Sequence, residues 1–160
     1  MRTKILRRVA PIAAATGLAL GAAPVAAEAD TGAAAEGIAA DAPFRLYNSG
    51  SGRCLIDTPD LSGAWTGSCT SGRRYWRGVE DVWGGRVVNT TSGRCLTDKN
   101  GSALLMACTG AYNQMWYHLG YGLVQNVASG KCLQGATGGG GTWMSACNTS
   151  NTYQRWGTLS

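Results

Sequence analysis

The chain has 160 residues, with six cysteines, a single histidine and a formal net charge of +5. Its length fits one ordinary domain, or a small domain with additional segments. Four of its 14 basic residues lie within the first eight positions and the others are mostly scattered, so the charge gives no case for nucleic-acid binding.

The first 29 residues are predicted to be a secretory signal peptide. Four basic residues at the start are followed by a largely apolar run over residues 9–25, and the Ala-Glu-Ala of residues 27–29 fits a small-x-small cleavage site. A membrane anchor is the alternative interpretation, but Pro11 and Gly17 interrupt the apolar run and favour cleavage. The sequence therefore predicts a secreted, extracellular protein with no membrane span.

Residues 30–43 are predicted to be a disordered leader or linker. They are mostly Ala, Gly, Asp and Glu, and Ile38 is their only large apolar residue. Such a segment cannot bury enough apolar surface to offset the entropy that is lost on ordering. Residues 44–160 remain as one small domain.

The domain repeats one pattern three times, at a period of about 40 residues. A heptapeptide occurs as SGRCLID, SGRCLTD and SGKCLQG, starting at residues 51, 92 and 129. Each copy follows an apolar stretch that ends in Asn, and precedes a second cysteine and a tryptophan. These residues are Asn48, Asn89 and Asn126, then Cys69, Cys108 and Cys147, then Trp76, Trp116 and Trp156.

Each unit is predicted to form four short strands. In the second unit these are residues 86–89, 94–97, 103–108 and 114–119, with a polar loop over residues 98–102. Short strands with regular turn signals and no helical period are typical of an all-β sandwich or barrel. No unit can bury its own apolar face, so the three are expected to share one core that contains the repeated tryptophans.

The six cysteines are predicted to form one disulfide in each unit. An even number of cysteines behind a secretory signal indicates disulfides, and the absence of a C-x-x-C motif argues against reduced thiols or a metal site. Pairing within each unit treats the three units alike, and each bridge would contribute about 3 kcal/mol to stability. The predicted bridges are Cys54–Cys69, Cys95–Cys108 and Cys132–Cys147.

These repeats resemble the ricin-type β-trefoil lectin family, which is marked by Q-x-W motifs. Gln114 and Gln154 open matching motifs that end at Trp116 and Trp156, whereas the first unit has Arg74 in place of the glutamine. The resemblance implies an all-β β-trefoil of three pseudo-threefold repeats, in which a six-stranded barrel is capped by a triplet of hairpins. The repeats would span residues 44–83, 84–121 and 122–160. It also implies carbohydrate binding by a secreted, bacterial-type, single-domain protein.

The resemblance also implies where a sugar would bind. Family units use an acid just after the Cys-Leu pair, a polar and an aromatic residue on the third strand, and an Asn before the Q-x-W glutamine. The second unit keeps the most of this pattern, the acids of the first two units are displaced by one residue, and the third unit has Gly135 instead. The candidate carbohydrate contacts are Asp57, Trp65, Asp98, Tyr112, Asn113, Gln114 and Trp143.

Several of these candidates have a second interpretation. Asp57 and Asp98 fit either a ligand contact or a residue that caps a turn. Trp65 and Trp143 occupy equivalent third-strand positions and fit either repacked core or an exposed platform. The Q-x-W glutamines, Gln114 included, also fit a structural role in which they satisfy buried backbone groups.

The protein is predicted not to be an enzyme and to need no metal or cofactor, because nothing in the sequence pairs His118 with a nucleophile or an acid. The leading hypothesis is a monomeric, non-catalytic module that binds a galactose-type sugar or a polysaccharide. The alternative is a protein partner: a cell-surface or partner-binding subunit of a secreted toxin complex, similar to the A and C subunits of cytolethal distending toxins. A trefoil protease inhibitor is the weaker alternative.

Overall fold

The computed structural model describes residues 42–58, 60, 63–81 and 84–160. The predicted signal peptide and nearly all of the predicted leader lie outside the described residues. Within the described part, no helix is long and apolar enough to cross a membrane.

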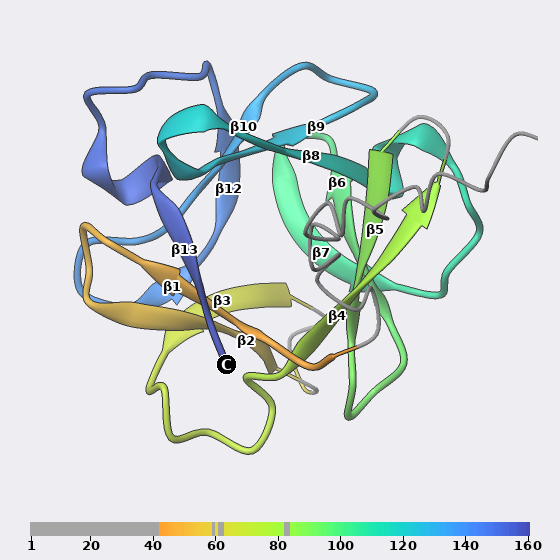
Figure 1. The fold of residues 1–160 in the computed structure, drawn as a ribbon, viewed down its shortest axis with the longest axis horizontal. Coiled ribbons are helices and arrows are strands. Elements are labelled where there is room, and N and C mark those ends of the chain that lie inside the picture. The colour runs from red at the N-terminus through yellow and green to blue at the C-terminus, as the bar shows by residue number, and fades with distance from the viewer. Residues whose placement is uncertain (1–41, 59, 61–62, 82–83) are drawn as a thin grey trace, which may run out of the picture. The chain divides into compact units, whose positions relative to one another are not determined.

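The described chain is built from short strands and three single 3-10 turns, and its three units lie around one centre (Figure 1). The first unit contains β1 (Arg45–Asn48), β2 (Arg53–Thr58), β3 (Gly63–Gly67) and β4 (Trp76–Asp81). The second contains β5 (Gly84–Asn89), β6 (Cys95–Lys99), β7 (Ser102–Met106), η1 (Tyr112–Gln114), β8 (Met115–Leu119) and η2 (Gly120–Gly122). The third contains β9 (Leu123–Asn126), β10 (Cys132–Gln134), β11 (Gly140–Gly141), β12 (Trp143–Ser145), η3 (Thr152–Gln154) and β13 (Trp156–Leu159).

Six of these strands close into a barrel. β1 pairs with β13, β4 with β5, β5 with β8 and β8 with β9, all antiparallel. Single bridges from Phe44 to Trp76 and from Leu123 to Arg155 complete the ring. The hairpins β2–β3, β6–β7 and β10–β12 form the cap, where β3 pairs with β7, β7 with β12, and β11 with β3. The predicted β-trefoil is confirmed.

The repeated tryptophans form the shared core, as predicted. Each is at most 4% exposed and packs with the leucine that follows the first cysteine of its unit. Each indole Nε1 also donates a hydrogen bond to the carbonyl of that leucine, so the polar edge of the ring is satisfied inside the core. The three bonds join Trp76 to Leu55, Trp116 to Leu96 and Trp156 to Leu133, at 2.9, 3.0 and 2.9 Å.

The repeated asparagines connect each unit to a neighbouring one. All three are fully buried, and each side-chain oxygen accepts hydrogen bonds from the turn that follows in its own unit. Each side-chain nitrogen donates to a carbonyl in the closing segment of the neighbouring unit. These bonds run from Asn48 to Tyr153, from Asn89 to Arg73 and Tyr75, and from Asn126 to Asn113 and Met115.

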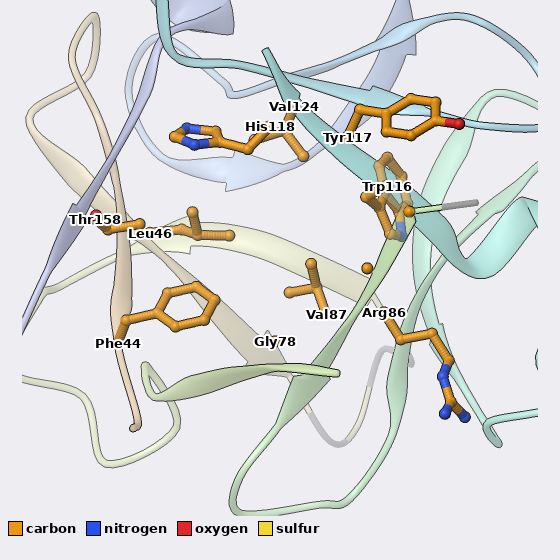
Figure 2. A pocket seen from close by; sticks show the side chains of 12 residues that line it. Phe44, Leu46, Gly78, Arg86, Val87, Trp116, Tyr117, His118, Val124 and Thr158 are labelled. Carbon is orange, nitrogen blue, oxygen red and sulfur yellow. The ribbon is translucent and has the colours of Figure 1, made fainter. Parts of the chain in front are cut away.

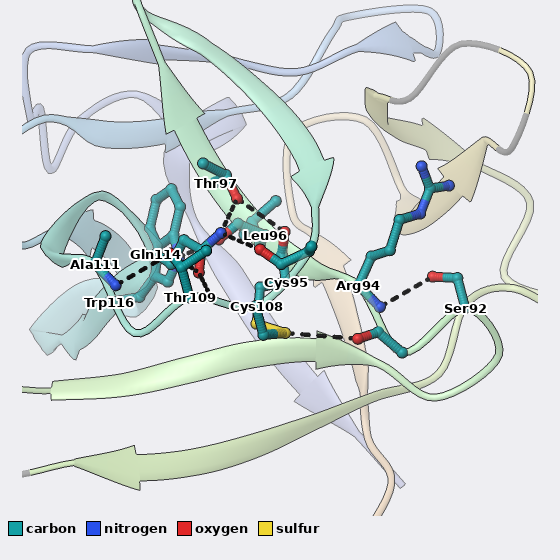
Figure 3. Close-up of a disulfide and its surroundings, with 12 residues drawn as sticks. Ser92, Arg94, Cys95, Leu96, Thr97, Cys108, Thr109, Ala111, Gln114 and Trp116 are labelled. Carbon is teal, nitrogen blue, oxygen red and sulfur yellow. Dashed lines mark hydrogen bonds between the residues drawn. A yellow bond between two sulfur atoms is a disulfide. The ribbon is translucent and has the colours of Figure 1, made fainter.

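The three predicted disulfides are confirmed: Cys54–Cys69, Cys95–Cys108 and Cys132–Cys147. Their Cα–Cα distances are 4.9, 5.1 and 4.9 Å, which lie within the ordinary range for a disulfide. Each bridge ties the start of a cap hairpin to the loop that returns to the barrel. Figure 3 shows the bridge of the second unit beside Gln114 and Trp116.

The loop predicted over residues 98–102 is shorter in the structure. β6 continues through Asp98 and Lys99, and Lys99 pairs with Ser102 across a two-residue turn. Asn100 and Gly101 form that turn with φ of 56° and 85°, the conformation that an Asn-Gly dipeptide favours in a tight hairpin. Asp98 therefore belongs to a strand, and its orientation follows the alternation of that strand.

Candidate functional site

Strand alternation places the acids of the first two units on the side of the strand that faces the core. Leu55 and Leu96 are fully buried in the core, and residues two apart in a strand point to the same face. Asp57 and Asp98 therefore share the face of those leucines. The outward position is the one directly after the leucine, because a shift of one residue reverses the face. Ile56 and Gln134 occupy it and are half-buried, whereas Thr97 occupies it in the second unit and is only 1% exposed.

Asp57 forms a buried ion-pair network between the first and second units. Its side chain has no exposed surface, and its two oxygens accept from Arg73 Nη1 at 3.3 Å and from Arg94 Nη2 at 2.9 Å. Asp57 and Arg73 belong to the first unit and Arg94 to the second. The carboxylate is therefore engaged by protein groups and turned away from the outward face.

Asp98 caps the tight turn of its hairpin. Its residue is 8% exposed, and Oδ1 accepts a hydrogen bond from the backbone N–H of Gly101 at 3.0 Å. Asn113 donates from Nδ2 to the backbone carbonyl of Asp98 at 3.1 Å, so these two residues do lie together. The contact fixes η1 against β6, and it uses one of the two amide protons of Asn113.

The outward face of the second unit has little free hydrogen-bonding capacity. Gln114 is 3% exposed; its amide nitrogen donates to Ala107 O and Thr97 Oγ1, and its oxygen accepts from Thr109 N (Figure 3). The third strand carries Leu104 opposite Thr97. Tyr112 is 57% exposed and supplies a ring at the surface. The unit that keeps most of the family pattern thus holds the Gln114 amide and the Thr97 hydroxyl in internal contacts.

The first unit offers an aromatic ring without a polar partner. Trp65 is half-buried and lies directly opposite Ile56, which occupies the outward position of β2. Arg74 replaces the Q-x-W glutamine: its guanidinium donates to the carbonyls of Thr70 and Ser71 and lies 4.3 Å from the centre of the Tyr75 ring. The arginine therefore bonds to backbone carbonyls of the loop before it, as the glutamine of the second unit does, but it accepts no bond in return.

The third unit brings an amide and an aromatic ring together at the surface. Gln134 lies in the outward position of β10, directly opposite Trp143 of β12, whose residue is 40% exposed. Gln134 Oε1 accepts from Asn151 Nδ2 at 3.3 Å and from Gln154 Nε2 at 3.2 Å. The Asn151 oxygen accepts from the backbone N–H of Tyr153, which holds its side chain in place.

Sequence reasoning missed Gln134 and Asn151. Of the third unit, the sequence marks Trp143 as a candidate, and Gly135 stands where the displaced acids of the other units lie. In the structure, Gly135 faces inward, and an added Cβ would lie 2.9 Å from Thr66 Cγ2. Strand alternation was the available signal, because it makes the residue directly after the core leucine the outward one.

This arrangement can bind a neutral polyhydroxylated ring. Both donors to Gln134 converge on its oxygen, and no described group accepts from its Nε2, so that nitrogen is left to donate outward. An amide donor beside an exposed indole offers one hydrogen bond to a hydroxyl and one apolar face to a ring. Over the described residues, no group of three or more His, Cys, Asp or Glu side chains gathers as a metal site.

A separate cavity of about 360 Å³ lies among the barrel strands. Phe44, Leu46, Val87 and Val124 are among the residues that line it, and Figure 2 shows the Arg86 guanidinium pointing away from them. Among the side chains that the structure describes, its lining contains no carboxylate and no amide. The cavity is lined by barrel strands and is distinct from the outward face of the third unit.

Comparisons with known proteins agree with this architecture. The family model described as a ricin-type beta-trefoil lectin domain matches residues 42–156. The designed threefold-symmetric protein ThreeFoil superposes with a TM-score of 0.64 and 22% identity, over 74% of this chain and 98% of its own. The hemolytic lectin CEL-III gives a TM-score of 0.61 and 26% identity, over 72% of this chain and 30% of its own, so this chain spans less than a third of it. A chain of the cytolethal distending toxin from Actinobacillus actinomycetemcomitans superposes with a TM-score of 0.60 and 17% identity, over 71% of this chain and 88% of its own. This similarity shows a shared fold. No curated protein matches.

Proposed function

Because the chain belongs to the ricin-type β-trefoil lectin family, we propose that it is a non-catalytic carbohydrate-binding protein whose principal site lies in the third unit. The contacts would be the Gln134 amide, the Trp143 ring and the Asn151 amide. One observation carries this proposal: Gln134 lies directly opposite an exposed Trp143, with its oxygen held by two internal donors.

The chemistry of these side chains favours a neutral sugar. Gln134, Trp143 and Asn151 carry no charge, and the amide nitrogen of Gln134 donates where other members of the family accept with an acid. A hydroxyl or ring oxygen of the sugar would accept that bond, and the apolar face of the ring would cover the indole. Of the sequence candidates, Trp143 stands at the centre of this site, with Tyr112 and Asn113 as a secondary surface in the second unit.

We propose an extracellular location for the protein. The three disulfides support an oxidising compartment, and the predicted signal peptide supplies the route of export. A single small domain with one principal site fits a monomer.

A partner-binding subunit of a toxin complex is the second candidate function. The shared fold with the cytolethal distending toxin chain supports it, as does the exposed indole of Trp143, since aromatic residues are frequent anchors of protein interfaces. A gene for a nuclease-like toxin beside the gene of this protein would favour this function over sugar binding.

The proposed function is tested by screening the purified protein on an array of neutral and acidic glycans, followed by titration calorimetry. We expect at least one neutral glycan to bind with a Kd between about a micromolar and a millimolar, which is the range for a small, partly open site. The absence of binding to every neutral glycan at millimolar concentration would contradict the proposal.

Glycan binding is expected to be independent of pH between about 3.5 and 8, because none of the three contact side chains titrates in that range. A site built on an aspartate would weaken as the pH falls toward about 4, where carboxylates in general take up protons. Calorimetric titrations across this range, with circular dichroism as the control for folding, distinguish the two. A loss of affinity at low pH in folded protein would indicate a carboxylate in the site.

A further inference from the structure

The outward face of the cap continues from the third unit into the first. Gly141 of β11 lies directly opposite Trp65 of β3, and Trp143 follows two residues later on the same stretch of chain. Residues two apart in an extended chain share a face, and so do directly opposed residues of paired strands. Trp65, Gly141 and Trp143 therefore point to one side.

The burial of the intervening residues supports this orientation. Ala64 and Thr66, which flank Trp65, are 1% and 3% exposed, and Thr142, between Gly141 and Trp143, is 5% exposed. The Thr142 hydroxyl also donates to the carbonyl of Ala64 at 2.8 Å, which holds the two units together from the inner side. The alternate residues are thus directed outward in both units.

Gly141 leaves the space between the two tryptophans open. A Cβ added to it would meet no heavy atom within 4 Å, so no side chain of the described residues covers this position. A cross-strand step of about 5 Å and two residues along the chain place the Cα atoms of Trp65 and Trp143 roughly 8–12 Å apart. Two indoles at this spacing, separated by bare backbone, extend over more than one sugar ring.

The residues of this face are uncharged. Ile56 lies opposite Trp65, and Gln134 lies opposite Trp143, so the row from β2 to β10 reads Ile56, Trp65, Gly141, Trp143 and Gln134. A flat, neutral row with two indoles and one amide donor complements a chain of pyranose rings that turn their apolar faces to the same side. A charged ligand would find no counter-charge among these residues.

We infer that Trp65 and Trp143 form one composite site across the first and third units, which holds a linear, neutral oligosaccharide along the row. This inference rests on the proposed function and extends it, because a site of the third unit alone would hold one sugar residue. In the composite site the Gln134 amide binds one residue of the chain, and Trp65 supports a residue farther along.

Chain-length dependence tests the inference. The probes are the dimers and hexamers of β-1,4-linked glucose, xylose and N-acetylglucosamine, each titrated by calorimetry into the purified protein. We expect one hexamer to bind at least about tenfold more tightly than its dimer. This gain in affinity corresponds to one additional aromatic contact. Trp65→Ala is expected to remove that gain while the affinity for the dimer stays unchanged.

A second variant guards against misfolding of Trp65→Ala. Gly141→Val places a side chain in the open space between the indoles. It is expected to remove the higher affinity for the hexamer over the dimer, as Trp65→Ala does. Tyr121→Ala is the matched control, because Tyr121 is 75% exposed in η2, which belongs to the barrel strands and not to the cap. It is expected to leave both affinities unchanged.

Two results would overturn the composite site. One is a wild-type protein that binds no hexamer more tightly than its dimer. The other is that both Trp65→Ala and Gly141→Val still bind the hexamer more tightly than the dimer, as the wild-type protein does. In either case, binding of a monosaccharide or dimer that depends on Gln134 would leave the proposed function standing, whereas the loss of all glycan binding would reject both.

Discussion

Replacing Gln134 by alanine is expected to reduce glycan affinity at least about tenfold, because the change removes the outward amide donor beside Trp143. It also removes the oxygen that accepts from the Asn151 and Gln154 amides, at 3.3 and 3.2 Å, so each of these side chains loses one of its hydrogen bonds. Calorimetric titration with the best neutral glycan of the array measures the effect. The Trp143→Ala variant is expected to lose affinity to a similar extent.

Two further variants separate binding from structure. Gln134→Glu keeps an oxygen for the two internal donors and can still accept from a sugar hydroxyl, so we expect it to keep more of the affinity than Gln134→Ala in a fully stable protein. Thr97→Ala changes the equivalent position of the second unit, where the hydroxyl is buried and bonded to Gln114, and is expected to leave glycan affinity unchanged. Equal binding by wild-type protein and Gln134→Ala would move the site away from the third unit.

Asp57→Ala is expected to destabilise the protein by about 3 kcal/mol, the lower part of the range for removing one member of a buried ion pair. The value lies at that end because the side chains of Arg73 and Arg94 are 38% and 26% exposed and gain some solvation when the carboxylate is lost. The loss also removes the contact of Asp57 with Arg94, one of several that join the first unit to the second. Urea unfolding with the disulfides intact, followed by tryptophan fluorescence, measures the free energy of unfolding.

The matched control for this prediction is Asp98→Ala, at the equivalent position of the second unit. Asp98 accepts one hydrogen bond from its own turn and takes part in neither of the ion pairs described for Asp57, so we expect a cost of about 1 kcal/mol. Similar free energies for the two variants would show that the Asp57 network contributes little. Both variants are expected to keep glycan binding, because neither carboxylate faces outward.

Much of the fold could be predicted from sequence because its determinants recur in each unit. The tryptophans at positions 76, 116 and 156 share a period with the cysteines, and a shared period in three small units requires a shared core. The disulfides followed from the same symmetry. The strand that carries Asp98 was placed less well, because the polar residues 98–102 read as a loop although Asn100 and Gly101 carry a tight-hairpin signal.

The binding surface was less accessible to sequence reasoning. The repeat marks Trp143 as a candidate but not Gln134, because the acids of the other two units lie one position later, at Asp57 and Asp98. Asn151 lies 17 residues from Gln134 in the chain, and only the fold of η3 against β10 brings the two amides within 3.3 Å. Neither spacing nor composition marks that contact.

By itself, the sequence determined the three units, their disulfides and their common core, because these depend on residue types that recur at one period. Only the tertiary structure decided which polar groups remain free to bind. Asp57 meets Arg94 of another unit, and Trp65 shares a face with Trp143 through Gly141. Contacts of this kind join residues that are distant in the chain, and they depend on how the hairpins pair in space, which the local pattern of each unit does not specify.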